Sequence, residues 1–155
     1  MIYQNIMVAV DGSDTSKLAL EEAIKIAQNL KSTLRLITVF DEHFISYNQF
    51  YIDHDPVVAS FRDEGQNILN TMEELVRKSK IKYECRLVGL KAEEGRIAEK
   101  IVAEAKAWHA DLLILGTHGR RGFSHLFLGS VAEGVIRIAT MPVLLVRGKE
   151  DILKK

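Results

Sequence analysis

Two short segments of this chain combine glycine with small polar and acidic residues, the residue types from which phosphate-binding loops are built. The first is Asp11-Gly12-Ser13, and the second runs from Gly116-Thr117-His118-Gly119 to Gly129-Ser130. A glycine tolerates positive φ and lets a ligand approach main-chain N–H groups to hydrogen-bonding distance. The two segments therefore predict a site at which the backbone itself binds a ligand.

Ser130 begins a segment, about 130–140, that we predict to be a helix. The first N–H groups of a helix have no internal partner, and the helix dipole favours negative charge there. Phosphate is the commonest occupant of such a site, and the Ser130 hydroxyl would add a donor. The alternative is purely structural, because glycines are common in strand-to-helix turns and Ser130 could be only an N-cap.

Two better-known phosphate motifs are absent from the chain. It contains neither the GxxxxGK[ST] pattern of a P-loop nor a GxGxxG following a strand. A phosphate site in this chain would therefore be of another kind.

Apolar runs alternate with amphipathic segments along the chain and predict the elements that carry these loops. We expect strands at 6–10, 34–40, 83–89, 111–116 and 142–147, and helices at 14–30, about 58–76, about 97–105 and about 130–140. Repeated strand–helix alternation means parallel pairing through right-handed crossovers. The expected fold class is α/β, an open parallel five-stranded sheet with helices on both faces.

An open parallel sheet binds its ligand outside the carboxyl ends of the strands, where the strand order reverses. We assume the order 3-2-1-4-5, which places the first strand centrally; the sequence itself does not show this order. The ends of strands one and four are then neighbours, and they carry Asp11 and residues 116–119.

Composition narrows the class of protein. The 155 residues fit one domain, and 47% hydrophobic with 27% charged residues is a globular soluble composition. Lysine plus arginine and aspartate plus glutamate both number 21, which argues against a general nucleic-acid binder. No apolar run reaches the roughly 18 residues of a membrane span, and no signal peptide is evident. We expect no membrane insertion and a cytoplasmic location. The single cysteine, Cys85, cannot form an internal disulfide, which agrees with a reducing compartment.

The spacing of Gly116, two residues, Gly119, nine residues and Gly129-Ser130 resembles the nucleotide-binding signature of the universal stress protein family, in its ATP-binding branch. The likeness includes NIMVAVDGSDTS, AEEGRIAEKIVAEAKAWHADLLILGTHGRRG and GSVAEGVIRIATMPVLLVR, and leaves out only residues 41–57 and the last eight. It implies a Rossmann-like fold of the adenine nucleotide alpha hydrolase type. It also implies a single domain over 1–147, followed by a charged tail at 148–155.

The resemblance further implies a bound adenine nucleotide, ATP or else ADP or AMP. Asp11 would bind the ribose hydroxyls with help from the Gly116 backbone. Val39 would offer its backbone to the adenine edge, between apolar walls from Ala9 and Leu115, although the family often has a proline where Ala9 stands.

The phosphates would be held by Gly119, Gly129, Ser130 and Val131, and Mg²⁺ would be bound through the phosphates. Replacing Gly119 or Gly129 by valine should then abolish binding and leave the fold intact. His118 could contact a phosphate or transfer a proton, or be an ordinary surface histidine.

Other residues leave alternatives open. Arg120 and Arg121 could neutralise phosphate charge or simply be solvated. Trp108 is expected in the core, residues 41–57 form either a cover over the site or an irregular connection, and the charged tail is expected to be disordered.

Three functions are compatible with such a site. A regulatory protein that binds nucleotide is the favoured one, with a slow ATPase or self-phosphorylating enzyme as the alternative. A receiver-like phosphoacceptor is excluded, because strand three ends in LVGLKA without an aspartate. The apolar edge strand 143–147 predicts a homodimer, the family's usual arrangement, although Arg147 and Lys149 could instead be charges that discourage pairing. The downstream protein partner is unknown.

Overall fold

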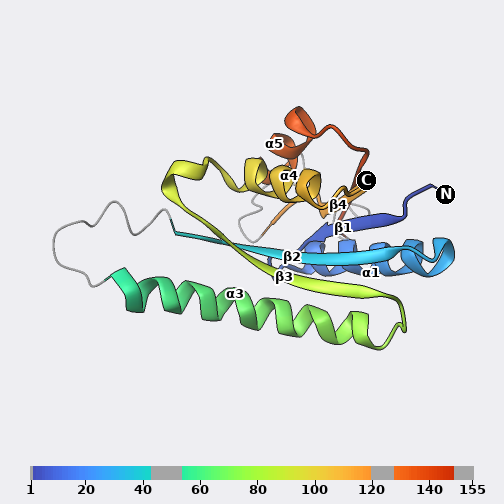
Figure 1. Ribbon diagram of the computed structural model, residues 1–155, viewed down its shortest axis with the longest axis horizontal. Helices are drawn as coiled ribbons and strands as arrows, with labels where there is room; N and C mark the ends of the chain where they lie inside the picture. The colour runs from blue at the N-terminus through green and yellow to red at the C-terminus, as the bar shows by residue number, and fades with distance from the viewer. Residues whose placement is uncertain (1, 43–53, 120–127, 149–155) are drawn as a thin grey trace.

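The computed structural model describes residues 2–42, 54–119 and 128–148 and contains one five-stranded parallel sheet (Figure 1). The strand order is β3-β2-β1-β4-β5, which confirms the assumed order. The strands are β1 (Asn5–Ala9), β2 (Thr33–Asp41), β3 (Tyr83–Leu90), β4 (Leu112–Gly116) and β5 (Val143–Val146). All four neighbouring pairs are parallel, as the strand–helix alternation predicts.

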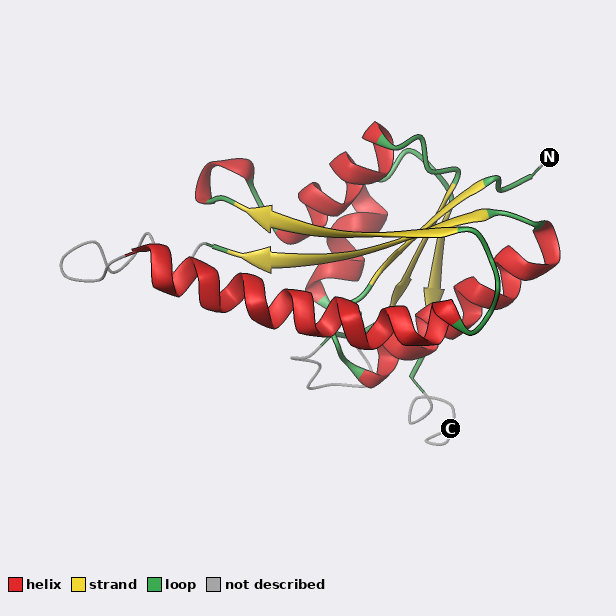
Figure 2. Ribbon diagram, turned by 60° about the horizontal axis from the view of Figure 1, so that its bottom comes forward, coloured by secondary structure: helices red, strands yellow, loops and turns green. Residues whose placement is uncertain are grey.

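Helices cover both faces of the sheet, as expected from the sequence (Figures 1 and 2). They are α1 (Asp14–Leu30), α3 (His54–Arg77), α4 (Ile97–Ala107) and α5 (Ser130–Ile138), with a short 3-10 turn, η1 (Ala92–Glu94). The helices α1 and α3 pack on one face, and α4 and α5 pack on the other. Each face carries its own apolar core, because a strand presents alternate side chains to opposite faces.

The first turn of α1 is fixed by the residues that precede it. Ser13 is the N-cap, and its hydroxyl oxygen accepts a hydrogen bond from the Ser16 N–H at 3.1 Å. Such a cap stabilises a helix by about 1 kcal/mol. The helix begins at Asp14, as predicted, so Asp11 is held in the short turn between β1 and α1.

The central strand β1 stops before its neighbour β2 does. Ala9, the last residue of β1, is opposite Ile37, whereas β2 continues to Asp41 alongside β3. One residue after β1 ends, the Val10 N–H still donates a hydrogen bond to the Ile37 carbonyl of β2, at 2.9 Å. Beyond it, no strand among the described residues pairs with β2 on the β1 side, and a crevice opens there at the carboxyl end of the sheet.

The structure corrects some expectations. The helix α3 already begins at His54 and β2 ends at Asp41, so the connection is shorter than 41–57, and residues 43–53 lie outside the described residues. Trp108 is only partly buried and packs beside the core, with the Arg35 guanidinium 4.6 Å from its ring centre. Residues 149–155 of the tail also lie outside the described part.

None of the helices in the described part of the chain is both long enough and apolar enough to span a membrane.

Cys85 lies partly buried on β3 and yields a test of this packing. Burial, with a smaller contribution from the Glu73 carboxylate, raises the pKa of the Cys85 thiol to about 11. Because the thiolate is the nucleophile, we expect slow alkylation by iodoacetamide at neutral pH, with a rate that rises along a curve centred near that pKa. A curve with its midpoint near the pKa of a free thiol, about 8.5, would contradict this packing.

The same shift links stability to pH. The folded-state pKa of Cys85 lies above the unfolded-state value, so its contribution to stability is complete at neutral pH. That contribution should be lost as the pH rises from the unfolded-state pKa toward the folded-state one. Urea denaturation of the wild type and Cys85→Ala across this range measures the difference.

Candidate functional site

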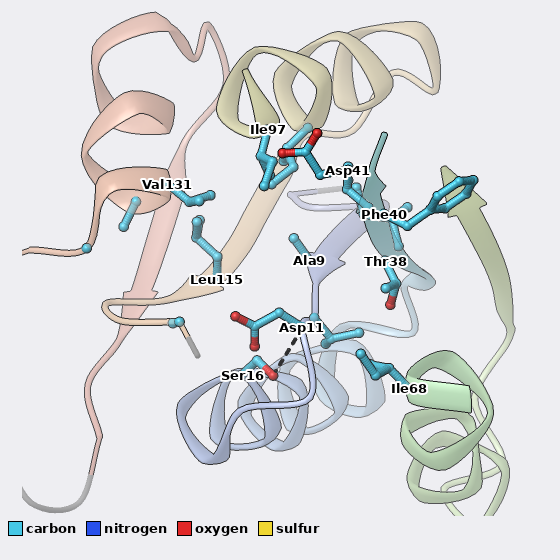
Figure 3. A pocket seen from close by; sticks show the side chains of 18 of the residues that line it. Ala9, Asp11, Ser16, Thr38, Phe40, Asp41, Ile68, Ile97, Leu115 and Val131 are labelled. Atoms are coloured by element: carbon cyan, nitrogen blue, oxygen red, sulfur yellow. Dashed lines mark hydrogen bonds between the residues drawn. The ribbon is translucent and has the colours of Figure 1, made fainter. Parts of the chain in front are cut away.

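One cavity of about 540 Å³ lies at the crevice and opens at the carboxyl ends of β1, β2 and β4 (Figure 3). All ten candidate binding residues from the sequence line this cavity. They are Ala9, Asp11, Val39, Leu115, Gly116, His118, Gly119, Gly129, Ser130 and Val131. Residues from three strands, two connections and the first turn of α5 therefore meet at a single site.

An apolar slot forms the α4/α5 side of the cavity. Ala9, Leu115 and Val131 lie on this side, and Ile97 and Ile101 of α4 complete the wall (Figure 3). The sequence identified both isoleucines only as part of the apolar stripe of a helix. Apolar residues at i and i+4 indicate a buried helix face but do not show that part of this face borders a cavity. A slot of this kind suits a flat, largely apolar ring.

Val39 turns its main-chain groups toward the crevice. In a parallel pair, residues two apart on a strand direct their N–H and C=O to the same neighbour. The Ile37 carbonyl faces β1, where it accepts from Val10, so Val39 faces the same side just beyond the end of β1. The backbone of Val39 can therefore bond a ligand ring held in the slot.

The cavity continues around the end of β1 onto the α1/α3 face. Its lining there includes Val10, Thr38, Phe61 and Ile68, none of which the sequence assigned to a site. The Thr38 hydroxyl is buried and has no hydrogen-bond partner among the described residues. The sequence contained only the helical stripe of α3 as a sign of this wall.

The amino end of α5 opens on the cavity without a side-chain cap. Gly129 is the N-cap, with φ −62° and ψ 153°, and Ser130 is the first helical residue. The alternative that Ser130 is merely an N-cap is therefore wrong. Within the described residues, no hydrogen bond is made by the N–H groups of Ser130, Val131 and Ala132, so three donors face the cavity at the positive end of the helix dipole.

The three signature glycines do not use positive φ, contrary to the expectation from sequence. Among the described glycines, only Gly12 and Gly95 do so, at +85° and +91°. The positions of Gly116, Gly119 and Gly129 instead require the absence of a side chain.

A Cβ at each signature glycine would collide with another part of the protein. At Gly116 it would lie 2.6 Å from the Thr15 side chain, and at Gly119 it would lie 2.6 Å from Asp11 Oδ2. At Gly129 it would lie 2.9 Å from the Thr117 carbonyl oxygen. The glycines therefore let the end of β4 pack on the first turn of α1, and let the β4–α5 connection pack on itself and on the β1–α1 turn, whether or not a ligand is present.

Asp11 is held at the centre of this contact. Its Oδ1 accepts a hydrogen bond from the Ser13 N–H at 2.9 Å, and its own N–H donates to the Ser16 hydroxyl at 3.3 Å. Its Oδ2 lies on the side of Gly119. One carboxylate oxygen is thus used to shape the turn, and the other is directed toward the glycine loop.

His118 lines the cavity and is partly buried, which differs from an ordinary surface histidine. Its Nδ1 lies 3.0 Å from the Thr117 hydroxyl, a contact that restrains the ring. Arg120 and Arg121 lie outside the described residues. Among the described residues, no group of three or more histidine, cysteine or acidic side chains is arranged to hold a metal ion.

The sequence model of the universal stress protein family matches residues 2–147. The chain belongs to this family. A universal stress protein of Methanocaldococcus jannaschii, MJ0531, is 32% identical over 146 residues, which cover 94% of this chain and 83% of the relative.

Solved structures of related proteins share the fold of this universal stress protein. The structure of the hypothetical protein MJ0577 superposes with a TM-score of 0.81 at 27% identity, and the alignment covers 96% of this chain and 99% of that one. A universal stress protein solved in complex with cAMP has a TM-score of 0.66 at 26% identity, with coverage of 95% and 98%. The Rossmann-like fold expected from the sequence is confirmed.

The glycine contacts predict that Gly129→Ala destabilises the protein before any ligand is considered. Its new Cβ would meet backbone, which cannot rotate away, so we expect a loss of about 1–3 kcal/mol in the free energy of unfolding. Valine at this position should also destabilise the fold, contrary to the expectation from the sequence. Chemical denaturation of the ligand-free protein measures the loss.

Gly119→Ala is the matched comparison. Its Cβ would meet Asp11 Oδ2, the end of a side chain that can shift by giving up its hydrogen bond from the Ser13 N–H, so we expect a smaller loss of stability than for Gly129→Ala. Equal stabilities of the two variants and the wild type would contradict the contacts described above.

Proposed function

We propose that this chain is an ATP-binding universal stress protein, a cytoplasmic regulatory module of the stress response. Residues 1–147 would form its single domain, and 148–155 a charged tail. The observation that carries the proposal is the uncapped amino end of α5, which lies on the same cavity as the apolar slot and the Asp11 carboxylate. A nucleotide site requires hydrogen-bond donors for the phosphates, an apolar slot for the base and an acceptor for the sugar hydroxyls, and this cavity has all three.

The adenine ring would occupy the slot between Ala9 and Leu115, with its polar edge on the Val39 backbone. The ribose would lie over Gly116, with its hydroxyls donating to Asp11. Base, sugar and phosphate would then lie in their covalent order, from the apolar slot, past Asp11, to the amino end of α5.

The phosphates would lie against Gly119, Gly129, Ser130 and Val131, with Mg²⁺ bound through their oxygens. Hydrogen bonds to a charged group each contribute about 1.5–3 kcal/mol. A handful would offset the entropic cost of binding and give a micromolar dissociation constant, about −8 kcal/mol. The similarity to a universal stress protein solved with cAMP supports an adenine nucleotide as the ligand class.

Binding without rapid turnover is the favoured role. Hydrolysis requires a group that positions water and a cation clamp on the γ-phosphate. In the described part of the cavity, the residues that could assist beside the phosphate site are Asp11 and His118. A slow ATPase or self-phosphorylating activity is the alternative that the binding experiment below also tests.

We expect ATP to bind to the purified, nucleotide-free protein with a micromolar dissociation constant, and ATP, ADP or AMP to be released on denaturing protein made in cells. Asp11→Ala should weaken ATP binding about 10-fold to 100-fold, the loss of one hydrogen bond to a charged group. Calorimetric titration measures the affinity, and mass spectrometry identifies the released nucleotide.

Asp63→Ala is the control for this titration, because Asp63 is exposed on α3 and does not line the cavity. Wild-type affinity in the Asp11→Ala variant would refute the site. Rapid, metal-dependent loss of ATP that disappears in Asp11→Ala or His118→Ala would identify an enzyme instead.

We also propose a homodimer through the edge strand 143–147. The two edges of the sheet differ in character. On β3, Glu84 pairs with Arg35 and Arg86 pairs with Glu104, and charges of this kind discourage pairing with another strand. The other edge, β5, has the sequence VLLV, and all four residues are partly exposed.

The hydrogen bonds of β5 indicate how to test this proposal. The carbonyls of Pro142 and Val146 accept hydrogen bonds from β4. Because the main-chain groups of successive residues in a strand point to opposite sides, the N–H and C=O of Leu145 point away from β4, to the open edge of the sheet. Leu145→Pro removes an outward N–H and should convert the dimer to a monomer. Sedimentation at micromolar concentration should give twice the 17.5 kDa chain mass for the wild type; a monomeric wild type would refute the dimer.

A further inference from the structure

The hydroxyl of Ser16 is buried at the wall of the cavity and hydrogen-bonds within the protein as both donor and acceptor. Ser16 is 4% exposed. Its Oγ accepts a hydrogen bond from the Asp11 N–H at 3.3 Å and donates one to the Ser13 carbonyl at 3.0 Å. Its donor is therefore occupied, and its position is set by the turn rather than by a ligand (Figure 3).

Three restraints converge on the turn that presents Asp11. The Ser16 hydroxyl holds the Asp11 backbone, and the Ser13 N–H holds Oδ1 of the Asp11 side chain. Gly12 supplies a φ of +85°, and a Cβ there would lie 3.2 Å from Ile68 on α3. With the main chain and Oδ1 both fixed, the direction of Oδ2 is fixed as well, and Oδ2 lies on the side of Gly119.

We infer that Ser16 is a positioning residue for ribose recognition, and that it acts through Asp11 without touching the nucleotide. This inference rests on the proposed function. A serine in the first turn of α1 thereby couples the start of that helix to the sugar specificity of the site. Without its hydroxyl, the Asp11 N–H loses its partner, and the carboxylate is free to leave the orientation in which it accepts a ribose hydroxyl.

The test compares ATP with 2′,3′-dideoxy-ATP, which lacks the hydroxyls that Asp11 would accept. The measured quantity is the dissociation constant of 2′,3′-dideoxy-ATP divided by that of ATP. Ser16→Ala should lower this ratio about tenfold, the equivalent of one weakened hydrogen bond to a charged group, by weakening ATP binding alone. Affinity for the dideoxy nucleotide should be unchanged, which distinguishes loss of positioning from general damage to the cavity.

Ser32→Ala is the matched control. Ser32 is also buried, at 3% exposed, and its hydroxyl donates to the Tyr3 carbonyl near the amino ends of the strands, away from the cavity. This variant loses a comparable buried hydrogen bond and should keep the wild-type ratio. If Ser16→Ala does not fold, Ser16→Cys removes the hydroxyl with less change in volume and is expected to lower the ratio in the same direction.

The outcomes separate this inference from the proposed function. If Asp11→Ala abolishes the discrimination and Ser16→Ala retains it, Ser16 has no positioning role and the nucleotide site stands. If Ser32→Ala lowers the ratio as much as Ser16→Ala, the effect is general destabilisation, and the inference is overturned. If the wild type does not bind ATP, or Asp11→Ala keeps the full ratio, both the ribose site and the inference that depends on it fail.

Discussion

The connection between β4 and α5 can lie against the turn after β1 only because its glycines have no Cβ. A Cβ at Gly116 would collide with Thr15 in the first turn of α1, and a Cβ at Gly119 would collide with Asp11 in the turn itself. Two segments more than a hundred residues apart in sequence are thereby brought into direct contact. As a result of this contact, Asp11 and the amino end of α5 line the same cavity.

The sheet supplies the space beside that contact. Since β1 ends opposite Ile37 and β2 continues to Asp41, the carboxyl end of the sheet is left with a gap rather than a flat rim. Apolar residues of α4 wall one side of the gap, and the amino end of α5 lies at its border. A helix terminus with free N–H groups is costly when it is buried without partners, and an anionic ligand is one way to satisfy it.

The turn at Asp11 shows how local and distant restraints combine. Its hydrogen bonds to Ser13 and Ser16 are local and belong to the capping of α1, whereas its position against Gly119 depends on the order of the strands. Residues that shape the start of a helix therefore also shape the binding site. A serine with no free donor can matter for a ligand that it does not touch.

The sequence alone determined the periodic and the local features. Alternation of apolar and amphipathic segments gave the α/β class, and the spacing of Gly116, Gly119 and Gly129 gave the loop and its family, because both depend on residues near one another in the chain. Tertiary structure decided that these glycines serve close packing rather than positive φ, and that Ile97 and Thr38 reach the cavity. Such facts depend on which surfaces meet across the fold, and no local pattern of residue types contains them.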